Sequence, residues 1–404
     1  MRILLVHNYY GSSAPSGENT VFEAECALLR AQGQCVETFT RHSDAIRRRG
    51  LFGKILGAFS VLGNPFAARD LARVCRAFRP DVVHFHNMFP LISLLAVRAA
   101  SRYAPVVMTL HNYRLFCAAG IPMRAGKVCT DCLDRRCAGP AIAHRCYRHS
   151  LLATLPLAGA ISFYRARLPR WVARFIVLSE FQKTEMVKAG LPADKLAVKP
   201  NFIRSDAASP EKCAWRDRGN IVYVGRLSDE KGLATLIAAW RRVEEWMKAA
   251  ESGKVRLTLI GDGDARARYE RLARGLAVDF AGQKTNGEVR RQLARARGCV
   301  LPSECFEGMP MTILEALAAG TPCVVSDLGA LPDIVENGRT GFVFEAGNAD
   351  ALAEALVHVL RLPEDAYRTM CTAARAAYER RFTPESNYTQ LMEIYTGICG
   401  RGAR

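Results

Sequence analysis

The sequence predicts an α/β fold made of two domains, each built on a parallel β-sheet. Runs of β-branched and other apolar residues alternate with helical patterns along the chain, which is typical of parallel sheets with crossover helices. A chain of 404 residues is too long for one ordinary hydrophobic core and fits two domains of roughly 200 residues. Polar residues follow many of the strand-like runs, where open α/β sheets bind ligands.

The strand-like runs fall into two groups. They cover residues 3–6, 82–85, 106–110 and 175–178, and then 221–224, 257–260, 299–301 and 323–326. Between the groups, residues 198–210 combine Pro, Ser, Asp and Asn and are typical of an interdomain linker. The sequence therefore predicts a first domain over residues 1–202, a second over 203–383 and a final helix near 384–399.

A helix over residues 310–319 has clear start and stop signals. Pro310 suits its first helical position, Gly320 suits the residue just past its end, and Pro322 prevents continuation. The backbone N–H groups at its start, near Gly308 and Met309, are expected to face an anion such as a diphosphate.

Two carboxylates flank this helix start, with Glu307 in the preceding loop and Glu315 inside the helix. A carboxylate accepts two hydrogen bonds from a diol, so sugar or ribose hydroxyls are suitable partners. The pattern favours a nucleotide-sugar site, and a surface helix with two solvated Glu side chains is the alternative.

A second cluster follows the run at residues 221–224. Arg226 comes at the strand end, and Lys231 precedes the next helical pattern. Arg through its planar fork and Lys as a point charge suit a diphosphate. These positions, the turn between Gly261 and Gly263, and the spacing of Glu307 and Glu315 resemble the donor-domain motifs of retaining GT-B glycosyltransferases of family four.

The resemblance implies two Rossmann-like parallel-sheet domains facing a central cleft. The first would bind the acceptor, the second would bind the nucleoside-diphosphate sugar, and residues 384–404 would pack back on the first. It implies that Arg226 and Lys231 bind the diphosphate, Glu315 the ribose, and Glu307 the transferred sugar. The implied donor-binding residues are Gly17, Arg226, Lys231, Gly261, Gly263, Gly308, Met309, Pro310 and Glu315.

In the first half, the residues before a helical pattern at 21–32 resemble the family's glycine-rich loop, with Ser16 where relatives often have glycine. A plain turn with an N-cap is the alternative. His111 matches a family histidine at the transferred sugar, so His111 and Glu307 are the catalytic candidates. The acceptor-side candidates at the predicted strand ends are His86, Asn87 and Asn112.

The implied reaction moves a hexose-type unit to an acceptor hydroxyl with retention, without an enzyme nucleophile. The donor's leaving oxygen helps to deprotonate the acceptor, and the cations and helix end stabilise the diphosphate. No metal is therefore expected in catalysis. Asp262 and Asp264 match an acidic metal-binding triplet, but their position favours a tight turn.

Five cysteines gather in a short segment. Cys117, Cys129, Cys132 and Cys146 are compatible with a structural zinc site, and Cys137 is a fifth candidate. Reduced cysteines without metal are the alternative.

The net charge of +17 is concentrated in the first half. Residues 1–200 hold 28 Lys and Arg against 12 Asp and Glu, a net of +16. This favours an anionic acceptor or membrane surface. Residues 47–62 join a basic cluster to an apolar segment, which suggests either contact with anionic lipid or a core-packed helix. No nucleic-acid motif accompanies the charge.

The expected acceptor is a lipid-linked sugar or polysaccharide. The first apolar stretch is too short for a secretory signal, so we expect a cytoplasmic protein, peripheral on the inner face of the membrane if the basic segment binds lipid. The competing functions are a nucleotide-sugar epimerase of the same fold and a non-catalytic anion- or nucleic-acid-binding protein.

Overall fold

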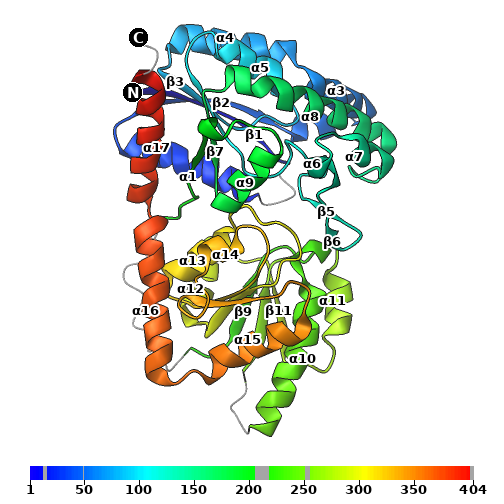
Figure 1. Ribbon diagram of the computed structural model, residues 1–404, viewed down its shortest axis with the longest axis vertical. Helices are drawn as coiled ribbons and strands as arrows, with labels where there is room; N and C mark the ends of the chain where they lie inside the picture. Colours follow the sequence, from blue (N-terminus) through cyan, green and yellow to red (C-terminus); the bar gives the residue numbers. More distant parts are fainter. Residues whose placement is uncertain (12–15, 49, 205–217, 251–254, 401–404) are drawn as a thin grey trace. The chain divides into compact units, whose positions relative to one another are not determined.

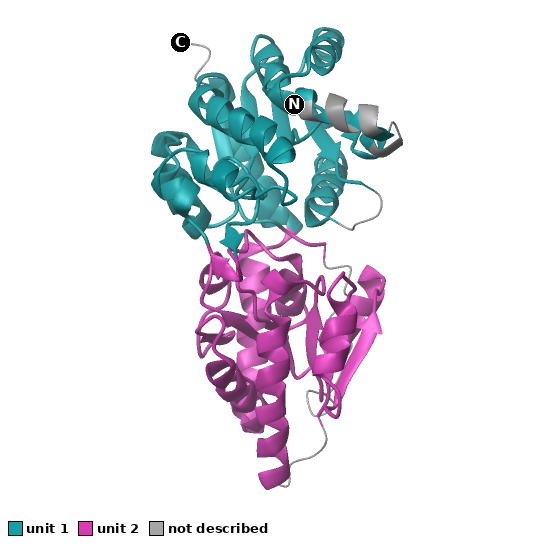
Figure 2. Cartoon of the chain, turned by 90° about the vertical axis from the view of Figure 1, so that its right-hand side faces the viewer, with its two compact units in different colours: residues 1–124, 129–201, 384–404 teal, residues 125–128, 202–383 magenta. Residues whose placement is uncertain are grey.

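A computed structural model describes residues 1–11, 16–48, 50–204, 218–250 and 255–400 (Figure 1). The chain divides into two compact units (Figure 2). Unit 1 holds residues 1–124, 129–201 and 384–404, and unit 2 holds residues 125–128 and 202–383. Most of the second half of the predicted linker, residues 205–210, lies outside the described residues.

Within its described residues, unit 1 has a six-stranded parallel sheet in the order β2-β1-β3-β4-β7-β8. Its strands are β1 (Arg2–Tyr9), β2 (Cys35–His42), β3 (Val82–Asn87), β4 (Val106–Thr109), β7 (Arg174–Val177) and β8 (Leu196–Val198). Its helices are α1 (Gly17–Ala31), α2 (Asp44–Arg48), α3 (Gly50–Leu62), α4 (Pro65–Phe78), α5 (Ser93–Ala100), α6 (Asp131–Asp134), α7 (Gly139–Ala143), α8 (Leu151–Trp171), α9 (Glu180–Lys188) and α17 (Pro384–Cys399), with the 3₁₀ turn η1 (Ala193–Lys195). The short strands β5 (Met123–Arg124) and β6 (Lys127–Val128) pair with each other.

Unit 2 has a second parallel sheet, with six described strands in the order β11-β10-β9-β12-β13-β14. Its strands are β9 (Ile221–Val224), β10 (Leu257–Ile260), β11 (Val278–Gly282), β12 (Gly298–Leu301), β13 (Cys323–Ser326) and β14 (Gly341–Phe344). Its helices are α10 (Leu233–Ala249), α11 (Arg266–Leu272), α12 (Asn286–Arg295), α13 (Met311–Ala318), α14 (Leu331–Ile334), α15 (Ala349–Arg361) and α16 (Glu364–Arg381), with the 3₁₀ turn η3 (Asp229–Lys231).

Each sheet contains a point at which the strand order reverses. In unit 1 the chain moves from β1 outward to β2 and then returns to β3 on the other side of β1. In unit 2 it moves from β9 to β10 and β11, and then returns to β12 beside β9. The loops after the two strands at such a point diverge and leave room for a ligand at the carboxyl ends of the strands. The site residues should therefore lie after β1 and β3 in unit 1, and after β9 and β12 in unit 2.

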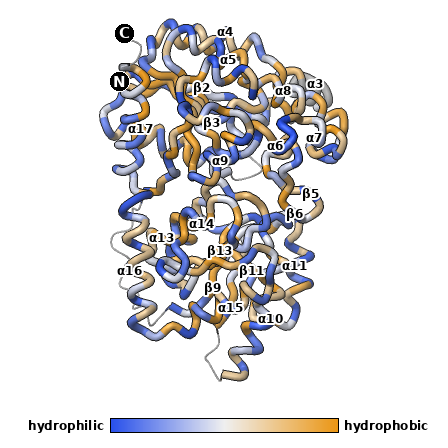
Figure 3. The backbone as a smooth tube through the Cα atoms, viewed as in Figure 1, coloured by the Kyte–Doolittle hydropathy of each residue, from blue (hydrophilic) through white to orange (hydrophobic). Residues whose placement is uncertain are grey.

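The last helix of the chain completes the core of unit 1. Leu391 and Tyr395 of α17 are fully buried in a cluster with Ile3 and Leu5 of β1 and Leu29 of α1. This cluster joins residues from both ends of the chain, so the core of unit 1 depends on α17. Figure 3 shows hydrophobic residues along the central strands and mixed colouring along the helices. None of the described helices is both long and apolar enough to cross a membrane.

The eight predicted strands are all present. In the described part of the two six-stranded sheets, the four strands that sequence patterns missed are the edges β2, β8, β11 and β14, and the short pair β5 and β6 was not predicted either. Edge strands are only partly covered, and their burial is accordingly mixed, whereas β10, β12 and β13 are buried throughout. An edge strand therefore lacks the continuous apolar run that marks a central parallel strand.

Two helix boundaries differ from the predictions. The helix predicted over residues 310–319 spans Met311–Ala318, and Pro310 is its N-cap instead of its first helical residue. The extended ψ of 119° at Pro310 keeps that residue outside the helix. Gly320 has a φ of +62°, as a residue just past a helix end requires. The helix predicted to start near residue 21 begins at Gly17.

Candidate active site

The loop after β9 holds both predicted diphosphate-binding cations. The Arg226 side chain is 59% exposed, and its guanidinium donates to Glu230 Oε1 at 2.9 Å. Ser228 Oγ donates to the same oxygen. Lys231 ends the 3₁₀ turn η3, and Gly232 with a φ of +67° leads into α10. The turn thus places the two cations on one short loop beside the reversal of the strand order.

Close backbone packing explains the glycines around this loop. A Cβ at Gly261 would lie 2.0 Å from the Gly225 carbonyl oxygen, and one at Gly263 would lie 2.5 Å from the Leu227 carbonyl oxygen. A Cβ at Gly232 would lie 1.9 Å from the carbonyl oxygen of Pro302, in the loop after β12. Only glycine permits these approaches. The glycines bring the loops after β9, β10 and β12 together, which is a structural reason for Gly261 and Gly263 independent of any donor.

Glu307 lies in the loop after β12, and both its carboxylate and its backbone carbonyl accept hydrogen bonds. Its Oε1 accepts from Lys231 Nζ at 2.6 Å and from Ser303 Oγ. Its backbone carbonyl accepts from Ala330 N at 3.1 Å. A Cβ at Gly329 would lie 2.7 Å from the Glu307 amide nitrogen, so this neighbour must be glycine. Sequence patterns gave no role to Ser303 or to Gly329, which lies between Leu328 and Ala330.

The ion pair fixes the charge state of both partners. Burial alone would raise the pKa of Glu307, but Lys231 and the Ser303 hydroxyl outweigh it, and the pKa lies below its usual value. Burial likewise opposes the charge on Lys231, yet Glu307 raises its pKa. The carboxylate and the ammonium are therefore both ionised, with side chains only 11% and 17% exposed.

Helix α13 begins beside the same loops. No side chain caps its start at Pro310, and Thr312 Oγ1 donates to the carbonyl of Val224 at the end of β9 at 3.2 Å. The helix N-terminus is thereby tied to the strand that precedes Arg226. Glu315, one helical turn further on, has its pKa raised by burial to about 7, with Arg290 opposing the shift. Gly308 and Met309 lie in the loop between Glu307 and the helix.

The predicted residues of unit 1 lie at the carboxyl ends of β3 and β4. His86 Nδ1 and His111 Nε2 are 3.1 Å apart, and their rings stack with centroids 5.2 Å apart. Burial lowers the pKa of His111 well below its usual value. His111 is therefore a neutral, ring-stacked side chain. His84 is fully buried between the hydroxyls of Tyr395 and Thr109, which is the environment of a structural side chain.

The two predicted asparagines differ in what they contact. Asn87 Nδ2 donates to the carbonyl of Asn8, and its Oδ1 accepts from Phe89 N, so Asn87 braces the turn after β3. Asn112 Nδ2 donates to Glu18 Oε1 at 2.7 Å. Gly17 is the exposed first residue of α1 and directly precedes Glu18. Asn112 is thus linked to the start of α1, whereas the Asn87 amide uses one polar atom on β1 and the other in the turn after β3.

Glu18 is a residue to which sequence patterns gave no role. Its Oε2 is buried and makes no hydrogen bond within the described structure. Burial raises its pKa, against the opposing effects of Asn112 and Arg114. A buried carboxylate oxygen without a partner is costly unless a ligand supplies a hydrogen bond. Glu18 therefore joins His111 and Asn112 as a candidate for binding a hydroxyl group.

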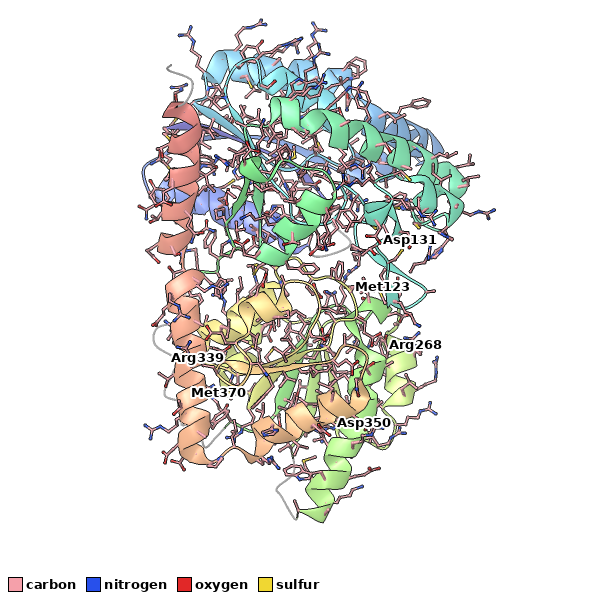
Figure 4. The ribbon with its side chains drawn as sticks, viewed as in Figure 1. Met123, Asp131, Arg268, Arg339, Asp350 and Met370 are labelled. Carbon is pink, nitrogen blue, oxygen red and sulfur yellow. The ribbon has the colours of Figure 1, made fainter. Side chains whose placement is uncertain are left out.

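The cysteine segment does not form a ready metal shell. Burial raises the pKa of the Cys132 thiol to about 11, and the neighbouring thiols of Cys117, Cys146 and Cys129 add to the shift. The four sulfurs are thus neighbours, but within the described part of the chain no three of them lie within 4.8 Å of one another. Cys137 is exposed. Figure 4 labels Met123 and Asp131 in this segment, where Asp131 pairs with Arg124 at 2.9 Å.

Similarity to known proteins agrees with this geometry. Residues 15–207 match the family model of Glycosyltransferase Family 4, and residues 218–361 match that of glycosyl transferases group 1. A glycogen synthase of Mycobacterium tuberculosis is 32% identical over 344 residues, which are 81% of this chain and 71% of that protein. The chain belongs to the glycosyltransferases of family four.

One further relative and one solved structure are also similar to this chain. The amylovoran biosynthesis glycosyltransferase AmsK of Erwinia amylovora is 31% identical over 232 residues. That alignment covers 54% of this chain and 54% of the Erwinia protein, about half of its length. The crystal structure of Anabaena HepE with UDP and glucose superposes with a TM-score of 0.63 at 18% identity, over 98% of this chain and 99% of that one. The predicted GT-B fold is confirmed.

Proposed function

We propose that the protein transfers a hexose-type unit from a nucleoside-diphosphate sugar to an acceptor hydroxyl, with retention of anomeric configuration. The observation that carries this proposal is the Lys231–Glu307 ion pair, which joins the loops after β9 and β12 at the reversal of the strand order in unit 2. Family membership and the UDP bound to HepE support a nucleotide-sugar donor.

The diphosphate is proposed to bind between the cations and the start of α13. Arg226 and Lys231 each contact a carboxylate in the structure, and phosphate oxygens can replace a carboxylate in such a contact. As the glycosidic bond breaks, negative charge grows on the leaving diphosphate. The two cations and the N–H groups at the start of α13 then stabilise that charge. The acceptor oxygen bonds to the anomeric carbon on the same face, and the leaving diphosphate oxygen takes the acceptor's proton, so no enzyme nucleophile is assigned.

Glu307 and Glu315 supply the hydroxyl-binding groups on the donor side. Glu307 is ionised and accepts hydrogen bonds, so hydroxyls of the transferred sugar can donate to it. Glu315 is proposed to bind the ribose, whose two hydroxyls would replace the hydrogen bonds that burial denies its carboxylate. His111, Asn112 and Glu18 are proposed to bind hydroxyls in unit 1.

We infer that the acceptor is presented at an anionic membrane surface, as a lipid-linked sugar or growing polysaccharide. Phe59 and Leu62 of α3 are exposed, and α3 packs against α8. On α8, Leu152, Leu155 and Phe163 are exposed within one helical face. We call these five side chains the apolar patch. The side chains of the basic residues 47–49 lie outside those that the structure describes.

Charge complementarity supports a lipid partner for the patch. The guanidinium of Arg167 lies 3.8 Å from the Phe163 ring centroid, so cation and apolar side chain occur together. Residues 1–200 carry a net charge of +16, and a basic, apolar surface suits anionic headgroups. The similarity to a glycosyltransferase of amylovoran biosynthesis supports a polysaccharide product.

Flotation with liposomes tests the membrane part of the proposal. We expect binding to vesicles of phosphatidylglycerol and phosphatidylcholine at low salt, and its loss in a Leu152→Asp plus Leu155→Asp variant. Leu272→Asp is the matched control, because Leu272 is 45% exposed on α11 of unit 2. If the wild-type protein remains unbound at low salt, or the patch variant floats equally well, the membrane part is wrong.

A panel of UDP-, GDP-, ADP- and dTDP-sugars tests the donor site through thermal stabilisation. One nucleotide class should stabilise the wild-type protein, and an Arg226→Ala plus Lys231→Ala variant should show no shift. If none of the donors stabilises the protein, with or without anionic vesicles, the proposed donor site is wrong. Conversion of the bound sugar to an isomer without acceptor would favour the epimerase alternative.

A further inference from the structure

Unit 1 contains a charged pair that the proposed reaction does not use directly. Glu25 of α1 and Lys199, which follows β8, are 1% and 2% exposed. Lys199 Nζ lies 3.1 Å from Glu25 Oε2 and also donates to Asn387 Oδ1 of α17 at 3.2 Å. The Asn387 amide is fixed in turn by the carbonyl of Pro200. A buried ion pair contributes little to stability unless its geometry is good, so its position calls for another explanation.

The other oxygen of Glu25 contacts two histidines. Glu25 Oε1 lies 3.0 Å from His86 Nε2 and 3.2 Å from His84 Nδ1. Burial opposes the charge on Glu25, but Lys199 and the two histidines outweigh it and hold the pKa well below its usual value. An ionised carboxylate only accepts hydrogen bonds. His86 must therefore carry a hydrogen on Nε2, which it donates to Glu25 Oε1.

The other ring nitrogen of His86 makes the next contact in this chain of hydrogen bonds. His86 Nδ1 lies 3.1 Å from His111 Nε2, so one of these two nitrogens donates to the other. The role of Nε2 in that hydrogen bond determines whether Nδ1 of His111 carries the ring hydrogen. Both ring nitrogens of His86 are engaged, so the stacked ring of His111 has one favoured orientation and one favoured tautomer.

We propose that Glu25 and His86 are positioning residues that hold His111 in one ring orientation and one tautomer, with Nδ1 available for a hydrogen bond with a sugar hydroxyl. This inference rests on the proposed function, because it assigns the group that meets the sugar in unit 1. Glu25, His86 and His111 form the relay triad. Lys199 keeps Glu25 ionised, so the carboxylate orients His86 without competing for its proton.

A metal ion is the other chemistry that such a cluster suggests. Possible ligand atoms of Glu25, His84 and His86 lie within 4.8 Å of one another. However, a divalent cation there would lie beside the Lys199 ammonium, which already contacts Glu25. The ring nitrogens of His84 also contact the hydroxyls of Tyr395 and Thr109. The positive charge and the occupied nitrogens favour a hydrogen-bonded relay over a metal site.

The test compares two variants that interrupt the relay triad in different ways. Glu25→Gln combined with Lys199→Met removes both buried charges together, so neither is left unpaired. His86→Gln keeps the ion pair and changes only the group next to His111. Glu185→Gln is the matched control, because Glu185 is also buried, in α9, and pairs with Lys188 at 2.6 Å. The histidine ring nitrogens are observed by ¹⁵N NMR, with His111 assigned by comparison with His111→Gln.

In the wild-type protein and the Glu185→Gln control, His111 should be a single tautomer. In both relay variants the tautomers should mix, and turnover of the donor identified by the panel should fall about tenfold to a hundredfold with unchanged donor affinity. A single tautomer of His111 together with wild-type turnover in both variants would overturn the inference. The tautomer of His111 is measured without any reaction, so loss of the relay and failure of the proposed function give different results.

Discussion

Units 1 and 2 both have charged residues near the point where the strand order of a parallel sheet reverses, but these charges differ in their burial and in their hydrogen-bond partners. In unit 1, Glu25 and Lys199 are almost completely buried and each has several fixed partners. In unit 2, Lys231 is partly exposed and Arg226 is mostly exposed, and each contacts a carboxylate. The first arrangement suits the orientation of a side chain, and the second suits exchange with an anionic ligand.

The difference follows from which elements cover each site. Helix α17 closes over the charges of unit 1 and supplies Asn387 and Tyr395 to their network. In unit 2 the cations lie on a short turn whose glycine neighbours leave the loops close together. The charges of unit 1 are thus enclosed by several elements, whereas those of unit 2 lie on one partly exposed loop.

Replacement of Glu307 should cause the largest loss of turnover among the expected effects. Glu307→Gln keeps the shape of the side chain but removes the charge opposite Lys231. On the proposed function it also removes the charge that meets the transferred sugar. We expect turnover to fall by about a hundredfold to a thousandfold, as for loss of one group that stabilises developing charge. Steady-state kinetics measures the change, and Glu270→Gln on the surface of α11 is the control. Turnover within a factor of two of the wild-type value would remove Glu307 from the site.

The raised pKa of Glu315 predicts a pH-dependent cost to stability. A carboxyl group with a pKa of about 7 in the folded protein favours the protonated form, so folding loses stability as the pH rises from its unfolded value near 4.5 to 7. At pH 8 the cost is about 3 kcal/mol, and near pH 4.5 it almost vanishes. Glu315→Gln should therefore increase the free energy of unfolding at pH 8 but not at pH 4.5.

Urea unfolding at the two pH values measures this difference. The same variant should bind the donor more weakly, since an amide accepts fewer hydrogen bonds from the ribose than a carboxylate. An equal change in stability at both pH values would show that Glu315 does not titrate in this range.

Substitutions at Gly329 and Gly338 distinguish the stability cost of a steric clash from the cost of backbone strain. Both have positive φ values, +63° and +75°, but a Cβ at Gly329 would meet the Glu307 backbone whereas Gly338 has nothing within 4 Å. Gly338→Ala should lower the free energy of unfolding by about 1 kcal/mol, from strain alone. Gly329→Ala should cost about 3 kcal/mol and also weaken donor binding, because the Glu307 loop must move. Equal losses in the two variants would contradict this account of the loop.

The sequence predicted the central strands and the paired loops of unit 2, because those features depend on short, local patterns. Arg226 and Lys231 lie on one loop, and glycine turns are visible in a single segment. The network of unit 1 could not be predicted in this way, since Glu25, His86 and Lys199 are far apart in the sequence. Glu25 occupies a helical position with no local signal, and its role depends on strands that only the fold brings beside it.

For the cysteines, the sequence pattern indicated which residues approach one another but not how closely. Their spacing suggested four ligands for zinc, and the fold does make Cys132 a neighbour of the other three thiols. Within the described residues, however, no three of these sulfurs lie within 4.8 Å of one another, and the structural zinc site stays a prediction. Spacing along the chain fixes which thiols can approach one another, whereas the irregular backbone around them fixes the distances.

Donor affinity and turnover, measured together in two variants, test the comparison between the units most directly. Lys231→Ala changes unit 2, and Glu25→Gln with Lys199→Met changes unit 1, with Glu185→Gln as the control. With the donor identified by the panel, calorimetry should show weakened donor binding only in Lys231→Ala, whereas turnover should fall in both variants. Equal donor affinity in all the proteins, or wild-type turnover in the unit 1 variant, would contradict the division of roles between the two units.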